Sequence, residues 1–442
     1  MTSSVFSRPF FLFYGLLWRL ARPLLKRSRR LADGWEERFI PADWLEPDFP
    51  SRHTERSAHP VDIWLQAASG GEARLAVAIC SALSKERPLR VLIATWTRQG
   101  RDVAEKALPS LALSHPLLRV AVRFAPFDQP YAALRAVRLA RPRVLALLET
   151  ELWPSLMAAC REEGVPVHVL NGRINASTVR FGRVFSSLMH AVAPRHVCAI
   201  AESDRKGFAS IFPCDTEVMP NIKFDLAAEL LESPLSEASQ SFVPGGPVFL
   251  FASVRDCEET RLPGHFSRIL KAMSDARIIV VPRHLHRVAE WKTRLDALGF
   301  DPLLITEAEP SQPVPHGRIL IWDRFGDLPG LYASAQAVFV GGSFGMGGQN
   351  FLESLAAGRI PCIGPSADNF LWAMDSGGLP SLEESGLLRV APTPEAVMDA
   401  MLELASSPLP REEVRKRFRT WLEPRLGTSV RCAALLEQAV QA

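Results

Sequence analysis

The stretch VDIWLQAASGGEARLAVAICSALSK, residues 61–85, contains the unit from which the fold can be predicted. Its first part, Val61–Ala67, is predicted to form a strand. A Ser-Gly-Gly turn follows at 69–71, and a helix is predicted from about Glu72 to Lys85. A strand that leads through a glycine turn into a helix is the repeating element of a parallel sheet covered by helices.

The same alternation of short apolar runs and helical stretches continues along the chain. In the first half, further elements are predicted as strands at Val91–Thr95, Arg143–Leu148, Val165–Leu170 and Val197–Ala201 and a helix at Asp102–Leu108. In the second half, strands are predicted at Val248–Ala252, Arg277–Val281, Arg318–Trp322, Ala337–Val340 and Ile360–Ile363. A basic amphipathic helix pair is predicted from about Pro410. The pattern predicts two doubly wound α/β domains that bind ligands at the carboxyl ends of their strands.

Length and composition agree with this prediction. The 442 residues suffice for two to three domains, 47% of them are hydrophobic and 22% are charged. A net charge of +3 is too small to indicate nucleic acid as a partner. The seven cysteines are far apart and form no CxxC pair, which indicates reduced thiols and neither a disulfide framework nor a zinc site.

The N-terminal segment differs from the rest of the chain. Residues 9–18, PFFLFYGLLW, are uncharged and rich in aromatics, and six cations follow by Arg30 without an acidic residue. The run is shorter than the roughly 20 apolar residues that span a membrane. Its charges come after the apolar part, unlike those of a signal peptide. A helix at the surface of an anionic membrane is predicted, and a helix packed on the protein's own core is the alternative.

Glu72 is a candidate catalytic residue in the first turn of the predicted helix. Gly70 and Gly71 before it leave room for a ligand to approach the backbone. A carboxylate at the carboxyl edge of a sheet can take a proton from a sugar hydroxyl while a new C–O bond forms. The alternative is structural, because the helix dipole favours glutamate in a first turn.

Charged residues also follow the next two predicted strands. Glu149 and Glu151 come directly after the apolar run at 143–148. Burying carboxylates beside a core strand costs free energy unless they form ion pairs or have a role in catalysis or binding. Capping of the helix that begins near Pro154 is the alternative. Arg173 follows the strand at 165–170 and suits a carboxylate or phosphate, although an ion pair with Glu149 or Glu151 fits equally well.

The second half contains a candidate nucleotide site. Arg283 follows a predicted strand, and a glycine-rich loop at 341–348 leads into a helix that begins near Asn350. Backbone N–H groups at a helix start suit a phosphate, and Asn350 and Glu353 suit ribose hydroxyls. The loop is neither a Walker sequence nor a clean G-x-G-x-x-G. There is no D-x-D motif, and His284 and His286 have no further ligand at metal-binding spacing, so no metal site is predicted.

Together these motifs resemble the 3-deoxy-D-manno-octulosonic acid (Kdo) transferases of lipid A assembly, which are inverting glycosyltransferases of the GT-B fold. The resemblance extends from the basic N-terminal segment to at least Gly378. Its anchors are ASGGE at 68–72, ETELWP at 149–154, NGR at 171–173, NIKFD at 221–225, VPRH at 281–284, GGS at 341–343 and GGQNFLE at 347–353. Each anchor is short, but their shared order and spacing is highly specific.

The resemblance implies CMP-Kdo as donor, the 6′-hydroxyl of a lipid A precursor as acceptor, and no metal or other cofactor. It implies that Glu72 is the general base and that Glu149 or Glu151, together with Lys223, stabilises the transition state. Acceptor or sugar binding is expected at Ser69, Gly70, Gly71 and Arg173. The expected CMP-binding residues are Pro282, Arg283, Phe325, Gly326, Asp327, Asn350, Phe351, Leu352 and Glu353.

The resemblance also implies an organisation and a location. A membrane-associating segment is expected at 1–35, an acceptor-binding domain at 36–225 and a CMP-sugar-binding domain at 248–442, with the two domains facing a cleft. Between the domains, residues 226–247 are rich in Ser, Pro and Gly with weak periodicity, which predicts a linker. The expected location is the cytoplasmic face of the inner membrane, where the acceptor's acyl chains are presented.

Two donor-side segments depart from the family pattern. The family has Ser-Thr-His-Pro-Gly-Glu-Glu where this chain reads Ser-Val-Arg-Asp-Cys-Glu-Glu at 253–259, and it has Gly-Gly-His-Asn-Pro where this chain reads Gly-Gly-Gln-Asn-Phe at 347–351. Arg255 would supply a cation where the family has its first histidine. The departures leave two alternatives: a related transferase that uses another nucleotide sugar, and a non-catalytic paralogue that binds lipid A.

Overall fold

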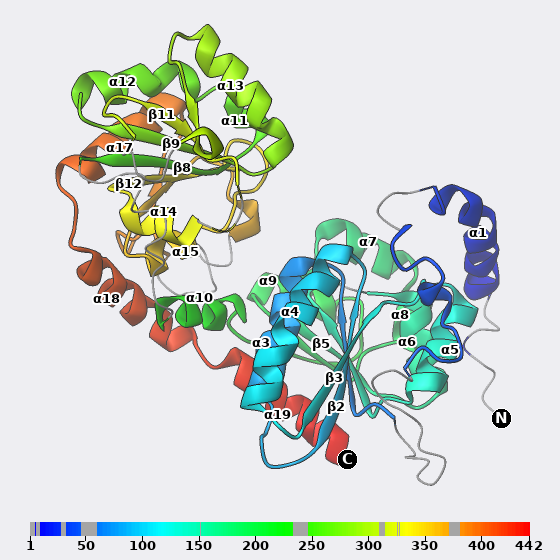
Figure 1. The fold of residues 1–442 in the computed structure, drawn as a ribbon. Coiled ribbons are helices and arrows are strands. Elements are labelled where there is room, and N and C mark those ends of the chain that lie inside the picture. Colours follow the sequence, from blue (N-terminus) through cyan, green and yellow to red (C-terminus); the bar gives the residue numbers. More distant parts are fainter. Residues whose placement is uncertain are drawn as a thin grey trace. The chain divides into compact units, whose positions relative to one another are not determined.

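The computed structural model describes residues 5, 9–27, 32–45, 60–150, 152–232, 246–308, 314–324, 326, 328–370 and 381–442. The chain divides into two compact units (Figure 1). Unit 1 comprises Met1–Asp225 and Gly427–Ala442, and unit 2 comprises Leu226–Leu426. Each unit is built on its own parallel sheet of seven described strands.

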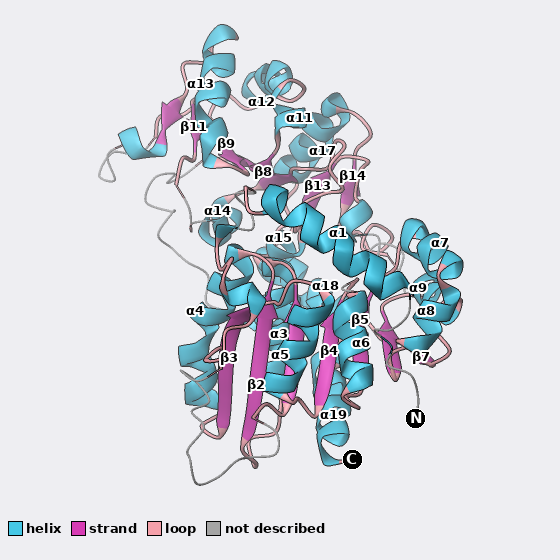
Figure 2. Cartoon of the chain, turned by 90° about the vertical axis from the view of Figure 1, so that its right-hand side faces the viewer, coloured by secondary structure: helices cyan, strands magenta, loops and turns pink. Residues whose placement is uncertain are grey.

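The sheet of unit 1 has the strand order β3-β2-β1-β4-β5-β6-β7. These strands run side by side in Figure 2. Their bounds are β1 (Ile63–Ala67), β2 (Leu89–Thr95), β3 (Leu118–Phe124), β4 (Val144–Leu148), β5 (Val167–Gly172), β6 (His196–Ala199) and β7 (Asp215–Val218). All residues of β1 and β4 are buried, as expected for central parallel strands with helices on both faces. The chain reverses its direction of sheet growth between these two strands, the position where doubly wound folds bind ligands.

Helices cover both faces of this sheet (Figure 1). On one face α3 (Gly70–Ala82) packs against α4 (Arg98–Ser114) and α19 (Thr428–Gln441). On the other, α5 (Pro130–Ala140) packs against α6 (Pro154–Glu162), and α1 (Pro9–Leu25) lies on α5. The unit also contains η2 (Glu37–Phe39), α7 (Ala176–Val184), α8 (Ser186–Ala191), α9 (Glu202–Ala209) and the start of α10 (Lys223–Glu232).

The sheet of unit 2 has the strand order β10-β11-β9-β8-β12-β13-β14. Its strands are β8 (Val248–Val254), β9 (Arg277–Pro282), β10 (Leu303–Leu304), β11 (Ile319–Ile321), β12 (Ala337–Val340), β13 (Pro361–Ile363) and β14 (Arg389–Val390). Its α-helices are α11 (Asp256–Glu259), α12 (Phe266–Ala272), α13 (Val288–Ala297), α14 (Leu328–Ser334), α15 (Leu352–Ala356), α17 (Pro394–Ser406) and α18 (Arg411–Leu422). An apolar core that includes Phe251, Trp291 and Met401 joins the sheet to these helices.

The C-terminal helix α19 belongs to unit 1, which differs from the predicted domain at 248–442. The Asp225 carboxylate accepts hydrogen bonds of 2.7 Å from the N–H groups of Gly427 and Ser429 at the start of this helix. The helix buries Leu436 within unit 1, and Glu437 accepts the N–H of Ser84. In the predicted linker at 226–247, residues 226–232 continue helix α10, and residues 233–245 lie outside the described part of the chain.

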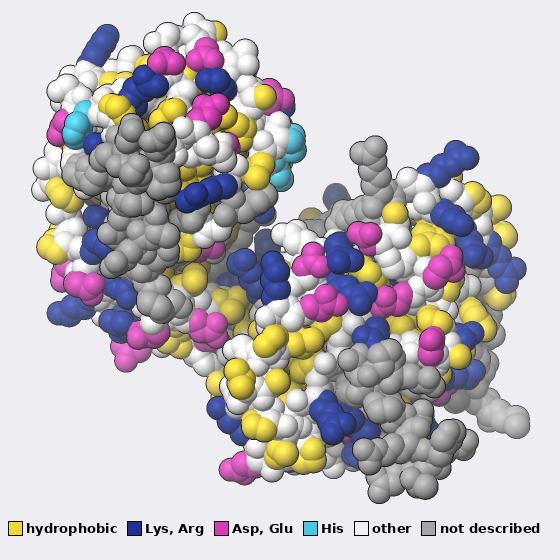
Figure 3. Space-filling view, viewed as in Figure 1, with side chains coloured by type: hydrophobic (Ala, Val, Ile, Leu, Met, Phe, Trp, Pro, Cys, Tyr) yellow, Lys and Arg dark blue, Asp and Glu magenta, His cyan; other side chains and the backbone are white. Residues whose placement is uncertain are grey.

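Helix α1 has one packed face and one exposed apolar face. Phe11 is 2% exposed, and the Trp18 ring packs against Phe127. The face of α1 that includes Phe11 and Trp18 therefore packs on the protein's own core, as the alternative prediction proposed. The other face exposes large apolar side chains: Leu12, Phe13, Leu16, Leu17, Leu20 and Leu24. In Figure 3 hydrophobic and basic side chains lie next to each other where α1 is placed. Among the described helices, none has the length and apolar character to cross a membrane.

A buried carboxyl group links α1 to the start of α6. The Tyr14 hydroxyl donates a hydrogen bond of 3.0 Å to Asp128, and the Leu156 N–H at the start of α6 donates one of 2.9 Å to the same carboxylate. Burial raises the pKa of Asp128 from 3.8 to about 7, although these hydrogen bonds oppose the rise. Because the folded-state pKa lies above the unfolded one, ionisation of Asp128 destabilises the fold progressively as the pH rises from about 4 to about 7.

Asp128→Asn is therefore expected to become more stable relative to the natural chain as the pH rises. Asparagine keeps an acceptor for the Leu156 N–H and cannot ionise, so the gain between pH 5 and pH 8 is expected to be about 2–4 kcal/mol. Thermal unfolding of both proteins across this range measures it. The same exchange at the exposed Asp43 is the control and is expected to change little. An equal effect of Asp128→Asn at both pH values would contradict this interpretation.

Candidate active site

Four of the predicted site residues in unit 1 meet at the carboxyl edge of its sheet. Ser69 follows β1 as the N-cap of α3, Glu72 lies in the first turn of that helix, and Glu149 follows β4. Lys223 is the first residue of α10. The topology therefore gathers side chains that lie up to 154 residues apart in the sequence, the separation between Ser69 and Lys223.

The Glu72 carboxylate is buried, with a residue exposure of 8%. It accepts hydrogen bonds from the Ser69 hydroxyl at 3.0 Å and from the Ala68 N–H, while the Glu72 N–H donates to Ser69 Oγ at 3.4 Å. These bonds have the form of a helix cap, so the structural interpretation of Glu72 holds as well. Burial and then the charge of Glu149 raise the pKa of Glu72, and no described cation forms an ion pair with it. A buried carboxylate without a counter-charge has the properties of a general base.

Glu149 forms an ion pair with Lys223, with 2.7 Å between Oε1 and Nζ. Its φ is 57°, a left-handed conformation that is costly for a residue other than glycine and that turns the chain sharply at the end of β4. The capping alternative is wrong for Glu149, because Trp153 is the N-cap of α6 and the Asp128 carboxylate accepts the Leu156 N–H. The other predicted carboxylate, Glu151, lies outside the described residues.

Arg173 follows β5 at the same edge and is half-buried. The Glu149 carboxylate pairs with Lys223 and forms no ion pair with Arg173, so that alternative is wrong. The alternative of an ion pair with Glu151 stays open, because Glu151 lies outside the described residues. Asn171, which the sequence analysis did not select, shapes this edge: its φ is 56° and its Oδ1 accepts the N–H of Ile222 at 2.8 Å. The bond holds the residue before Lys223 against the end of β5. The signal in the sequence was the asparagine before a glycine, since asparagine tolerates left-handed backbone.

The predicted nucleotide residues of unit 2 gather at the carboxyl edge of the second sheet. The Arg283 N–H donates to the carbonyl of Val254 at 2.8 Å, which joins the ends of β9 and β8. Its exposed side chain donates from Nε to Gln349 Oε1 at 3.1 Å. Asn350 Nδ2 donates to Glu353 Oε1 at 2.9 Å, so these two residues also contact each other.

The remaining members of the predicted nucleotide set lie around these residues. Pro282 ends β9 and is buried, as are Phe351 and Leu352 at the start of α15. Gly326 is exposed, with a φ of 105°. Phe325 and Asp327 lie outside the described residues.

Glu258 organises the glycine-rich loop, and sequence reasoning assigned it no role. Its carboxylate is fully buried and accepts N–H groups from Arg255 at 2.9 Å, Gly342 at 2.9 Å and Ser343 at 3.0 Å. The loop approaches β8 so closely that a Cβ at Gly341 would lie 2.5 Å from the Cα of Val254. The sequence did contain a signal for Glu258: the Glu-Glu pair at 258–259 agrees with the family pattern in this segment.

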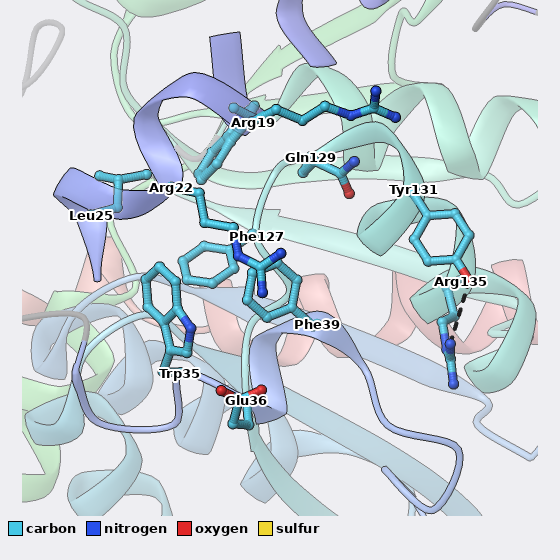
Figure 4. A pocket seen from close by; sticks show the side chains of 11 residues that line it. Arg19, Arg22, Leu25, Trp35, Glu36, Phe39, Phe127, Gln129, Tyr131 and Arg135 are labelled. Atoms are coloured by element: carbon cyan, nitrogen blue, oxygen red, sulfur yellow. Dashed lines mark hydrogen bonds between the residues drawn. The ribbon is translucent and has the colours of Figure 1, made fainter. Parts of the chain in front are cut away.

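A pocket of about 410 Å³ lies beside α1 in unit 1 (Figure 4). Aromatic rings form much of its wall, and the guanidinium group of Arg22 lies 4.5 Å from the centre of the Phe39 ring. Arg19 and Arg135 are further cations in the lining, and Glu36 is the acidic residue there. The pocket thus combines apolar surface with positive charge, and none of the predicted site residues lines it.

Comparison with known proteins identifies the family. The family model described as 3-deoxy-D-manno-octulosonic-acid transferase (kdotransferase) matches residues 33–226. A 3-deoxy-D-manno-octulosonic acid transferase of Bordetella pertussis is 31% identical over 441 residues, covering 96% of this chain and 98% of the relative. The chain belongs to the Kdo transferase family. A further member, from Haemophilus influenzae, is 26% identical over 368 residues, covering 80% of this chain and 82% of its own length.

A solved structure confirms the predicted fold of this Kdo transferase. A glycosyltransferase from Rickettsia africae ESF-5 aligns with a TM-score of 0.55 and 13% identity, covering 86% of this chain and 99% of that chain. The likeness supports the fold alone. The prediction of two doubly wound α/β domains of the GT-B type is correct, and family membership confirms that the chain is a glycosyltransferase.

Proposed function

We propose that this chain transfers Kdo from CMP-Kdo to the 6′-hydroxyl of a lipid A precursor in lipopolysaccharide biosynthesis, with inversion and without a metal. The observation that carries the mechanism is the Glu72 carboxylate. It lies buried at the carboxyl edge of the unit 1 sheet, has a raised pKa, and forms no ion pair with any described cation. Membership in the Kdo transferase family supports the substrates.

In this mechanism Glu72 removes the proton of the acceptor hydroxyl as the new C–O bond forms. A raised pKa makes the carboxylate a better proton acceptor, provided that it is ionised at the working pH. The Ser69 hydroxyl and the Ala68 N–H orient the carboxylate through the hydrogen bonds that they donate. Ser69, Gly70, Gly71 and Arg173 are proposed to position the acceptor or the sugar.

The other charged residues are proposed to stabilise negative charge on the sugar carboxylate and on the CMP leaving group. Lys223 is held by Glu149 at a fixed place on unit 1, so its ammonium group is already oriented before substrate binds. On unit 2, Arg283 offers the guanidinium nitrogens that do not bond Gln349. Asn350 and Glu353 present an amide and a carboxylate that suit the ribose hydroxyls.

Incubation of the purified full chain with CMP-Kdo and a lipid A precursor, followed by product mass, tests the proposal. The expected result is a mass increase of one or more Kdo units. Thermal-shift measurements with CMP and with UDP test which nucleotide the protein binds, given the altered segments at 253–259 and 347–351. Stabilisation by UDP and not by CMP would favour a transferase for another nucleotide sugar. Absence of transfer by folded protein that still binds lipid A would favour the non-catalytic paralogue.

The membrane-surface location is also proposed, at the cytoplasmic face of the inner membrane. Its support is the exposed apolar face of α1 next to Arg19 and Arg22, together with the aromatic and cationic pocket beside that helix. Leucine side chains that enter the interfacial region and guanidinium groups that bind lipid phosphates would hold the enzyme where an acylated acceptor is presented.

The double variant Leu16→Ser and Leu20→Ser is expected to bind anionic phospholipid vesicles at least about tenfold more weakly. These side chains are 50% and 67% exposed, so their replacement removes apolar area from the surface without opening the core. Vesicle sedimentation measures the affinity. Leu113→Ser, at an 84% exposed leucine on α4, is the matched control and is expected to bind normally. Equal binding by all three proteins would contradict the proposed role of α1.

A further inference from the structure

A cluster of metal-ligating side chains lies on the sheet of unit 1, apart from the proposed active site. His196 and Cys198 are two residues apart on β6, so both side chains lie on the same face of the sheet. Glu217 on β7 is the register partner of Cys198. The Glu217 Oε1 atom lies 2.6 Å from His196 Nε2 and 3.9 Å from Cys198 Sγ, and all three ligand atoms lie within 4.8 Å of one another.

A second thiol completes the set from another part of the chain. Cys432 on α19 is fully buried and acts on Cys198: it is the main cause that raises the pKa of the Cys198 thiol. Both cysteines are free thiols. Helix α19, which bears Cys432, is held on unit 1 by the Asp225 cap and by Glu437.

We propose that His196, Cys198 and Glu217 bind one Zn²⁺ ion and that the Cys432 thiol moves toward them as the fourth ligand. Two thiolates, an imidazole and a carboxylate form a ligand set that Zn²⁺ accepts in tetrahedral sites. With zinc–sulfur distances of about 2.3 Å and zinc–nitrogen or zinc–oxygen distances of about 2.0 Å, neighbouring ligand atoms are about 3.3–3.8 Å apart. Shifts of less than about 1 Å would bring the contacts of 2.6 and 3.9 Å into this range.

The surroundings of the cluster fit a bound dication. Arg431 donates to Glu217 Oε2 at 3.1 Å, which leaves Oε1 to face His196 and Cys198. The positive charge of Arg431 together with Zn²⁺ would balance two thiolates and one carboxylate. His168 is the register partner of His196 on β5, with 6.1 Å between ring centres, and neither of its buried ring nitrogens has a hydrogen-bond partner.

The ion would have a structural role. Its ligands come from β6, β7 and α19, and His196 is the first residue of β6, so the cluster lies toward the edge of the sheet opposite to Glu72. Four protein ligands leave no open coordination position for a substrate. Zinc would therefore fasten the C-terminal helix to the sheet and would take no part in the transfer reaction.

Metal analysis of the untagged full chain, expressed with zinc in the medium and purified without chelator, tests the proposal. The expected result is about one zinc per chain. Cys198→Ser and Cys432→Ser are each expected to lower the zinc content at least about tenfold, because the thiolates are the strongest ligands of the set. Cys214→Ser, at a half-buried thiol that is not in the cluster, is the matched control and is expected to keep the metal.

Cobalt substitution keeps the test decisive if a serine variant folds poorly. Co²⁺ added to chelator-treated natural chain is expected to give the thiolate-to-cobalt absorption of a tetrahedral site, and Cys432→Ala about half of its intensity. Natural chain without stoichiometric zinc and without this absorption would overturn the proposal. Retention of zinc by both serine variants would overturn it as well.

Discussion

Glu72→Gln is expected to lower kcat for Kdo transfer about 1,000-fold, the largest effect on catalysis that the structure predicts. Glutamine is nearly isosteric: its amide oxygen can accept the Ala68 N–H and its NH2 group can donate to the Ser69 hydroxyl oxygen, so the local backbone is expected to keep its form. It cannot take a proton. Turnover should therefore fall while the affinities for CMP and for the lipid acceptor stay within about threefold of the natural values.

The measurement is single-turnover transfer by the variant and by the natural chain, with binding measured separately. Glu86→Gln, the same exchange at an exposed position of unit 1, controls for unspecific effects and is expected to retain full activity. A kcat for Glu72→Gln within tenfold of the natural value would show that another group accepts the proton.

The pH dependence gives an independent readout of the same carboxylate. Burial and the nearby charge of Glu149 raise the pKa of Glu72. As the pH rises, kcat/KM should therefore increase at a pH above the usual pKa of a glutamate side chain. Glu149→Gln removes a like charge and releases the ammonium group of Lys223, and both changes lower the pKa of Glu72. In this variant the increase of kcat/KM is therefore expected at lower pH, even though the maximal rate also falls.

Glu258→Ala is expected to have the largest effect on stability. The change leaves the N–H groups of Arg255, Gly342 and Ser343 without their acceptor, and two of these three bonds are fully buried. At about 1–3 kcal/mol for each orphaned buried donor, unit 2 should lose about 3–5 kcal/mol of unfolding free energy. The glycine-rich loop would also lose its fixed form, so the affinity for CMP should fall at least about 100-fold.

Calorimetry of the full chain and CMP titration measure these two effects. Glu290→Ala, at an exposed glutamate of unit 2 that pairs with Arg287, is the control and is expected to change stability by less than about 1 kcal/mol. A Glu258→Ala protein with natural stability and natural CMP affinity would contradict the role assigned to this carboxylate.

The strands that the sequence predicted are those inside the sheets. Apolar runs indicated β1, β2, β4, β5 and β6 in unit 1 and β8, β9, β11, β12 and β13 in unit 2, and each of these has a neighbour on both sides. The four strands that sequence reasoning missed, β3, β7, β10 and β14, are the described edge strands of the two sheets. Three of these strands are short and contain no buried residue; β7, for example, reads Asp-Thr-Glu-Val. The fourth, β3, is mostly buried, but Arg119 and Arg123 interrupt its apolar run.

The part of the candidate site that directly follows buried strands could also be predicted from apolar runs. Residues that directly follow a buried strand, such as Glu149 and Arg283, stand out in the sequence because a charge interrupts an apolar run. Glu258 acts across 84 residues on the N–H of Gly342, and the His196–Cys432 cluster combines three distant elements. Local spacing contains no information on such contacts, since only the strand order brings the residues together.

Helix α19 completes unit 1 although it follows unit 2 in the sequence, and this affects the order in which the two units can fold during synthesis. Unit 2 is one uninterrupted segment, 226–426, inserted into a unit whose last helix is at 428–441. Domains commonly finish folding in the order in which the ribosome releases them. Here the later-encoded unit has all of its residues first, while the nascent unit 1 must wait with the α19-binding surfaces of α3 and β4 uncovered. Chaperones that bind emerging apolar surface are therefore expected to act on the half of the enzyme that was translated first.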